Sequence, residues 1–179
     1  GNSFISGDIK YYREGKKHID FIGVFNRSRH KRPEDFIEIT KKLQEDNPKY
    51  KIHLITYGDE GNYLNFLDHG YAHPNFVHQD FITNKRTLFP MSEDELFKLI
   101  SSAKAFIHPS SSEGASRMVV ASCLLGVPVF YNEDIKGGTF SDDLKESNVV
   151  YPYKVFSDVV RIGIRNLKPI NIVNLDNKF

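Results

Sequence analysis

Short apolar runs alternate with amphipathic stretches along most of this chain. Apolar runs of about four to eight residues are typical of buried strands, whereas apolar positions repeated every three or four residues are typical of helices. The predicted strands are HIDFIGVF (18–25), KIHLITYG (51–58), NFVHQDF (75–81), AFIH (105–108), the apolar segment after Gly126, and VVYPY (149–153).

The stretches between these strands predict helices. Pro33 opens the first helix, with two acids in its first turn and an apolar stripe from Phe36 to Leu43. Ser92 begins another with the capping-box pattern Ser-Glu-Asp-Glu. Further helices are predicted at 60–69, from the Ser/Gly loop near 116 to Gly126, at 141–147 and at 156–167.

Strands that alternate with helices, without a hairpin signal, indicate a parallel sheet covered on both faces. The predicted fold class is therefore α/β, a Rossmann-like doubly wound sheet with strand order 3-2-1-4-5-6. In this order strands one and four are neighbours, and ligands bind beyond their carboxyl ends. The loops at 23–32 and 109–116 should face each other there.

Composition limits the alternatives. The length of 179 residues, with 40% hydrophobic and 26% charged residues, is typical of one ordinary globular domain. We expect a linker at 1–17, the domain at 18–170 and a C-terminal tail at 171–179. The net charge of +1 favours neither nucleic acid nor a membrane surface as a partner. The single cysteine, Cys123, excludes an internal disulfide and a cysteine-based metal site, which suits a cytoplasmic protein.

The first of the two facing loops is basic. RSRHKR, residues 27–32, places four cations and His30 within six positions. Cations aimed into the crevice could neutralise a diphosphate, and we expect Arg27 and Lys31 to point inward. A solvated basic loop is the alternative. A nucleic-acid patch is disfavoured, because aromatic residues do not alternate with the cations.

The second loop leads into a helix N-terminus, where unpaired amides and the helix dipole favour anions. The amides of Gly114, Ala115 and Ser116 could hold phosphate or sugar oxygens. Glu113 suits sugar hydroxyls as an acceptor, although an acid that stabilises the helix dipole is the alternative. His108 lies close enough to line the same crevice. The remaining histidines are scattered and there is no Asp-x-Asp motif, so no metal is expected.

These residues resemble a known family. SEGASRMVVASCLLGVPV is similar to the donor-binding signature of retaining family-4-type glycosyltransferases of the GT-B fold. Pro109-Ser110, Glu113-Gly114, Gly126 and Pro128-Val129 match that signature in register. The resemblance extends over about 20–165, including the basic segment after the first strand, and the order of its motifs is more specific than any one of them.

The resemblance implies a function. The chain would be the C-terminal, nucleotide-sugar-binding half of an enzyme that moves a sugar from a UDP- or GDP-sugar to a glycan or lipid-linked acceptor. Surface polysaccharide or glycoconjugate biosynthesis is the usual setting. The acceptor-binding N-terminal domain would be missing, together with any attachment to the inner face of the membrane. This chain alone would then bind donor without transferring sugar, with no cofactor and no metal.

The resemblance also implies site residues. Arg27, Lys31 and Glu113 would be catalytic. The donor would be held by Gly23, Gly58, Phe81, Ile82, Ser110, Gly114, Ala115, Ser116 and the position of Ala121.

One departure from the family pattern bears on activity. The family has a second glutamate, which binds ribose, where this chain has Ala121, and alanine cannot accept a hydrogen bond from a hydroxyl. Glu133 and Asp134 are candidate substitutes. A catalytically inactive sugar-nucleotide-binding or interaction domain therefore stays open, as does a GT-B-like sugar-nucleotide epimerase.

Overall fold

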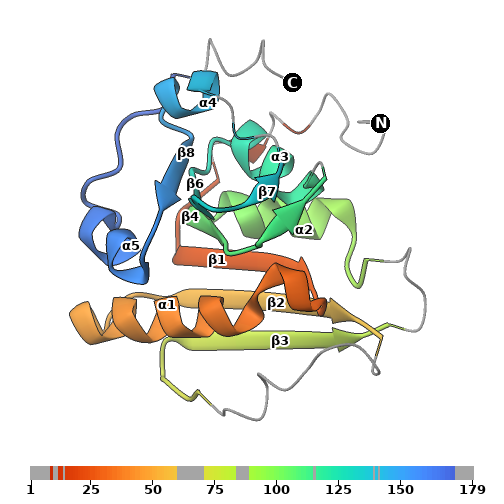
Figure 1. Cartoon of the computed structure of the whole chain (residues 1–179). Helices are drawn as coiled ribbons and strands as arrows, with labels where there is room; N and C mark the ends of the chain where they lie inside the picture. The colour runs from red at the N-terminus through yellow and green to blue at the C-terminus, as the bar shows by residue number, and fades with distance from the viewer. Residues whose placement is uncertain are drawn as a thin grey trace.

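Six parallel strands form the central sheet of the computed structural model, which describes residues 9, 12–13, 15–59, 71–83, 89–114, 116–138, 140 and 142–171 (Figure 1). Their order is β3-β2-β1-β4-β6-β8, which confirms the predicted order 3-2-1-4-5-6. The strands are β1 (Ile19–Asn26), β2 (Ile52–Gly58), β3 (Phe76–Ile82), β4 (Ala103–His108), β6 (Val129–Asn132) and β8 (Val150–Tyr153).

The helices begin where the sequence places their caps. Pro33 is the first residue of α1, and the hydroxyl of Ser92 accepts a hydrogen bond from the amide of Glu95 at the start of α2. The predicted helix at 60–69 lies outside the described residues. The helices are α1 (Pro33–Asp46), α2 (Glu93–Ser101), α3 (Arg117–Leu124), α4 (Asp142–Glu146), α5 (Phe156–Ile162) and the short 3-10 helix η2 (Arg29–Lys31).

The core has two layers because strand side chains alternate between the faces of the sheet. On one face, Phe21 and Leu54 pack with α1 and α5. On the other, Ile22 and Ile55 pack with α2 and α3, together with the buried thiol of Cys123. Within the part of the chain that is described, no helix is long and apolar enough to cross a membrane.

Three described residues of the segment 1–17, namely Ile9, Tyr12 and Arg13, contact the domain. Ile9 is buried in the layer of α2 and α3. The Tyr12 ring packs edge-on against Phe97, and its hydroxyl donates to Asp94 at 2.6 Å. The Arg13 side chain donates to the carbonyl of Leu124 at 2.6 Å.

A second, two-stranded parallel sheet was not predicted. It pairs β5 (Ser112–Glu113) with β7 (Lys136–Gly137), and so ties the loop after β4 to the loop after β6. Gly137 has φ 82°, and a Cβ there would overlap the carbonyl oxygen of Glu113. Strands of two residues carry no periodic signal, so the sequence pattern could not reveal them.

Candidate functional site

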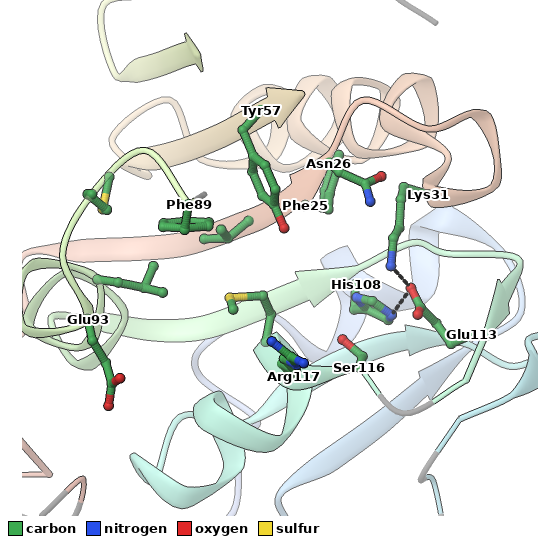
Figure 2. A pocket seen from close by; sticks show the side chains of 14 residues that line it. Phe25, Asn26, Lys31, Tyr57, Phe89, Glu93, His108, Glu113, Ser116 and Arg117 are labelled. Carbon is green, nitrogen blue, oxygen red and sulfur yellow. Dashed lines mark hydrogen bonds and ion pairs between the residues drawn. The ribbon is translucent and has the colours of Figure 1, made fainter. Parts of the chain in front are cut away.

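A cavity of about 610 Å³ opens at the carboxyl ends of β1, β2 and β4, in front of the N-terminus of α3 (Figure 2). Its position is the switch point of the doubly wound sheet, where the sequence predicts a ligand site. Its volume suits a small molecule. Lys31 and Glu113 lie at one end of the cavity, and the other end is mainly aromatic and apolar, although Glu93 also lines the cavity.

Glu113 stands at the centre of the charged end. Its Oε1 atom accepts a hydrogen bond from the ammonium of Lys31 and lies 3.4 Å from Nε2 of His108 (Figure 2). The Glu113 side chain is only 7% exposed and that of Lys31 14%. Burial raises the pKa of Glu113, but His108 and Lys31 outweigh burial and lower it to about 2. The carboxylate is therefore ionised at neutral pH.

His108 lies beneath this ion pair. Its side chain is 1% exposed, and its ring lies between those of Phe106 and Phe140, with centroids 6.4 and 6.3 Å away. Burial lowers the pKa of His108, while the Glu113 carboxylate opposes that effect, and the imidazole is neutral at neutral pH. Neither ring nitrogen has a hydrogen-bond partner among the described residues.

The aromatic end of the cavity is built from Tyr57 and Phe89. Their rings meet edge to face with centroids 4.8 Å apart. Figure 2 shows the Tyr57 hydroxyl directed into the cavity. Burial and the charge of Glu113 raise the pKa of Tyr57, so the hydroxyl stays protonated. Val24, Met91, Leu96 and Met118 complete an apolar wall suited to a flat, uncharged group.

Hydrogen bonds hold the two loops of the charged end together. The carbonyl oxygen of His30 accepts from the Ser111 amide at 2.8 Å and from the hydroxyls of Ser110 and Ser111, each at 3.1 Å. Ser110 is fully buried and does not line the cavity. Its contribution is to link the loop of Glu113 to the basic turn that carries Lys31.

The N-terminus of α3 closes the site on the remaining side. Ser116 is its N-cap and accepts a hydrogen bond from the Val119 amide at 3.3 Å, and Ser116 and Arg117 both line the cavity. A Cβ built on Gly114 would meet no atom within 4 Å, so the space on that side of the loop is open. Ala115 lies outside the described residues.

Arg27 does not face the cavity, contrary to the expectation from sequence. It is 1% exposed, its guanidinium lies 3.2 Å from the carboxylate of Asp80, and it donates to the carbonyl of Asp59 at 3.1 Å. Val24, Phe25 and Asn26 all line the cavity, whereas the next residue, Arg27, is held away from it by its buried ion pair with Asp80 of β3.

Two glycines that were predicted to hold the donor, Gly23 and Gly58, also lie away from the cavity. A Cβ on Gly23 would overlap the ring of Phe36, so this glycine allows α1 to pack closely on β1. Gly58, with φ 136°, lies against Arg27. Both positions shape the backbone behind the site.

The predicted residues at the end of β3 and in α3 do not line the cavity either. The Phe81 side chain is partly buried and packs against the core, whereas Ile82, on the edge strand β3, is 55% exposed. Ala121 is fully buried among core residues. The proposed ribose substitutes, Glu133 and Asp134, are also absent from the cavity wall. Of the predicted set, the structure brings together Lys31, Glu113 and Ser116, with Gly114 beside them.

Sequence reasoning missed several cavity residues. Asn26 and Tyr57 lie at the carboxyl ends of β1 and β2, and strand alternation places both on the cavity face. That signal was available. Arg117 follows the helix cap and could also have been proposed, whereas Phe89 lies in a connection without a periodic pattern. Among the described residues, no group of three or more His, Cys, Asp or Glu could hold a metal ion.

Comparison with known families gives one match. Residues 8–139 match the family model described as glycosyl transferases group 1. No curated protein matches the chain.

Solved structures share the fold at low sequence identity. A variant of S. aureus TarM in complex with fondaparinux, α-GlcNAc-glycerol and UDP has a TM-score of 0.59 and 16% identity over 92% of this chain and 32% of its own. The C-terminal domain of LpcC, a glycosyl transferase group 1 protein from Francisella tularensis, has a TM-score of 0.58 and 14% identity over 86% of this chain and 77% of its own. WaaG, a glycosyltransferase involved in lipopolysaccharide biosynthesis, has a TM-score of 0.56 and 15% identity over 97% of this chain and 46% of its own.

The extent of these matches differs. The chain spans about a third of the length of TarM and under half of WaaG, but most of the single LpcC domain.

Proposed function

The chain belongs to the glycosyl transferases group 1 family, and on this basis we propose that it is the donor-binding domain of a glycosyltransferase that uses a nucleoside-diphosphate sugar. The observation that carries the proposal is the single cavity with a Lys31–Glu113 pair at one end and the Tyr57–Phe89 wall at the other. A nucleotide sugar has matching parts, namely a charged diphosphate, a hydroxyl-rich sugar and a flat base.

The charged end suits the diphosphate. Lys31, Ser116 and Arg117 line the same space, and the last two lie at the N-terminus of α3. When the bond between the sugar and the diphosphate breaks, negative charge grows on the leaving group, and cations fixed beside it stabilise that transition state. Lys31 is therefore assigned to the leaving group.

Glu113 suits the sugar. An ionised carboxylate repels phosphate but accepts hydrogen bonds from hydroxyl groups. Its pKa of about 2 keeps it ionised throughout the physiological range. The base would then lie against Tyr57 and Phe89, where aromatic faces favour stacking.

The complete enzyme is proposed to have a second domain that binds the acceptor, with transfer in the cleft between the two and retention of anomeric configuration. The matches to under half of WaaG and to an isolated C-terminal domain of LpcC support this arrangement. The involvement of WaaG in lipopolysaccharide biosynthesis supports a glycan or lipid-linked acceptor and a role in surface-polysaccharide synthesis.

A catalytically inactive sugar-nucleotide-binding domain is the second candidate, and Ala121 is the observation that favours it. The buried alanine supplies no acceptor for ribose hydroxyls, and the described cavity wall contains neither Glu133 nor Asp134. Slow hydrolysis of a UDP- or GDP-sugar by the full-length protein would favour the active enzyme. Binding without hydrolysis or transfer would favour the inactive domain.

Calorimetric titration of this chain with UDP, GDP and ADP tests the proposal. We expect binding of at least one of them, and Lys31→Met should weaken it about tenfold or more, because a charged hydrogen bond to phosphate is lost. Lys41→Met is the matched control, since Lys41 lies on α1 and pairs with Glu38 away from the cavity. Failure of the unmodified chain to bind any of the three would refute the proposed function.

A further inference from the structure

The carboxylate of Glu113 is approached by two groups of different mobility. Lys31 lies on the turn η2, and its long side chain, which ends in an ammonium, is 14% exposed. His108 is the last residue of β4, and its ring is fixed between Phe106 and Phe140. Both groups approach the same oxygen, Oε1 (Figure 2). One partner can therefore leave while the other stays.

Binding of a diphosphate would separate the first pair. The ammonium of Lys31 can reorient toward phosphate oxygens by bond rotation, because it is a flexible point charge with three donors. Glu113 would then be a buried carboxylate without its cation, which is strongly unfavourable unless another donor replaces it. His108 is the described donor closest at hand.

The ring of His108 has the capacity to take over. Its Nε2 lies 3.4 Å from Oε1, which is longer than a good hydrogen bond, and neither ring nitrogen has a hydrogen-bond partner among the described residues. A small shift of the carboxylate toward the ring would form a full hydrogen bond. The imidazole can supply it as a neutral donor or, more strongly, as a cation.

We propose that His108 is a positioning residue: it takes the Glu113 carboxylate when Lys31 turns to the diphosphate, and so keeps that carboxylate aimed at the sugar. The inference rests on the proposed function, because it requires a ligand with both a diphosphate and a sugar. It adds separate roles for the two partners of Glu113. Lys31 binds the leaving diphosphate, and His108 keeps Glu113 in place to contact the sugar.

The charges around His108 determine how its pKa changes when Lys31 leaves Glu113. The charged and titratable groups that act on the ring are Glu113 from β5 and Lys31 and His30 from η2. Lys31 lowers the pKa of His108 and Glu113 raises it. Departure of Lys31 removes one opposing charge and leaves the carboxylate, so the pKa of His108 rises when the ligand binds.

The first test measures the contribution of the sugar to binding. Wild type, His108→Gln and His108→Leu are titrated with UDP and UDP-N-acetylglucosamine, and with GDP and GDP-mannose. Glutamine keeps an amide donor and leucine removes it. We expect His108→Leu to reduce the affinity ratio of sugar nucleotide to free nucleotide about fivefold or more, with UDP or GDP binding within about twofold of wild type and with His108→Gln retaining the ratio. Equal weakening of both ligands, or an unchanged ratio in both variants, would overturn the proposal.

The second test needs no nucleotide, so it separates this inference from the proposed function. The His108 ring is titrated by NMR in wild type, in Lys31→Met, which imitates departure of the lysine, and in Lys31→Met with Glu113→Gln. We expect the titration midpoint to rise by about one pH unit or more in Lys31→Met and to fall again when Glu113 is neutralised. An unchanged midpoint in Lys31→Met would overturn the inference, even if UDP binds. Absence of nucleotide binding, by contrast, refutes the proposed function and leaves the titration to decide the role of His108.

Discussion

Lys31 and Glu113 are 82 positions apart in the sequence and form an ion pair inside the cavity. The two residues follow β1 and β4, which are neighbours in the sheet although two other strands separate them along the chain. Parallel topology therefore creates this contact, and Lys31 helps to lower the pKa of Glu113. This ion pair should therefore contribute to the stability of the fold.

Acid should weaken the fold through Glu113. The pKa of Glu113 falls from its ordinary value of 4.5 to about 2 in the folded state. The Glu113 carboxylate therefore stabilises the protein fully above pH 4.5, and this contribution is lost as the pH drops toward 2. The contribution to the free energy of unfolding is on the order of 3 kcal/mol at neutral pH. Urea unfolding of wild type and Glu113→Gln from neutral pH to pH 2.5 measures it, as a difference that shrinks on acidification. A difference independent of pH would contradict the ion-pair explanation, and Glu38→Gln, at an exposed position of α1, is the control.

Arg27 should matter for stability and not directly for ligand binding. Asp80→Asn keeps the acceptor for the Thr56 hydroxyl, now 2.7 Å from Oδ1, but removes the charge opposite the buried guanidinium. We expect a loss of about 3 kcal/mol in the free energy of unfolding. Affinity for nucleoside diphosphate should stay within about twofold of wild type. A large loss of affinity in a folded Asp80→Asn protein would indicate that Arg27 takes part in ligand binding after all.

Two glycines near Glu113 should respond in opposite ways to alanine. Gly137→Ala introduces a Cβ against the Glu113 carbonyl at φ 82°, so we expect a loss of about 1–3 kcal/mol in unfolding free energy. Gly114→Ala meets no neighbouring atom within 4 Å and should leave stability nearly unchanged. Its Cβ would instead hinder a ligand held by the loop amides. Thermal unfolding and nucleotide titration of both variants check the contrast, and a Gly137→Ala protein as stable as wild type would refute the role given to β7.

Two serine caps provide a matched pair. Ser92 caps α2 and Ser116 caps α3, each by accepting an amide hydrogen bond three residues ahead. Replacing either by alanine should cost about 1 kcal/mol of unfolding free energy. Ser116→Ala should in addition weaken nucleoside diphosphate binding about fivefold, because this cap lines the cavity. The same affinity for both variants would show that the α3 N-terminus does not contact the ligand.

The fold was predictable because the signals that determine it are local. Apolar runs mark the strands, and Pro33, Ser92 and Ser116 mark helix starts, so the alternation and the strand order follow from general topology rules. The loops that carry Lys31 and Glu113 could be placed opposite each other for the same reason, since both follow strands that the topology makes neighbours, although their ion pair was not predicted.

The orientation of individual side chains was harder to predict. Arg27 and Lys31 belong to one basic segment, yet Arg27 pairs with Asp80 of β3 while Lys31 reaches the cavity. The relation of His108 to Glu113 depends on the two-residue strand β5, which leaves no periodic trace. Phe89 reaches the cavity from an irregular connection, where local sequence carries little information about position.

The three hydrogen bonds accepted by the His30 carbonyl have a consequence for how ligands are chosen. They join the turn that carries Lys31 to the loop that carries Glu113, so the positions of the two loop backbones relative to each other are fixed before any ligand arrives. Little ordering entropy remains to be lost on binding, which favours affinity. The same rigidity also selects ligands. The phosphates and the hydroxyl groups of a ligand must be separated by a distance that matches the fixed spacing of the two loops. A change of preferred sugar would thus require substitutions in both loops together.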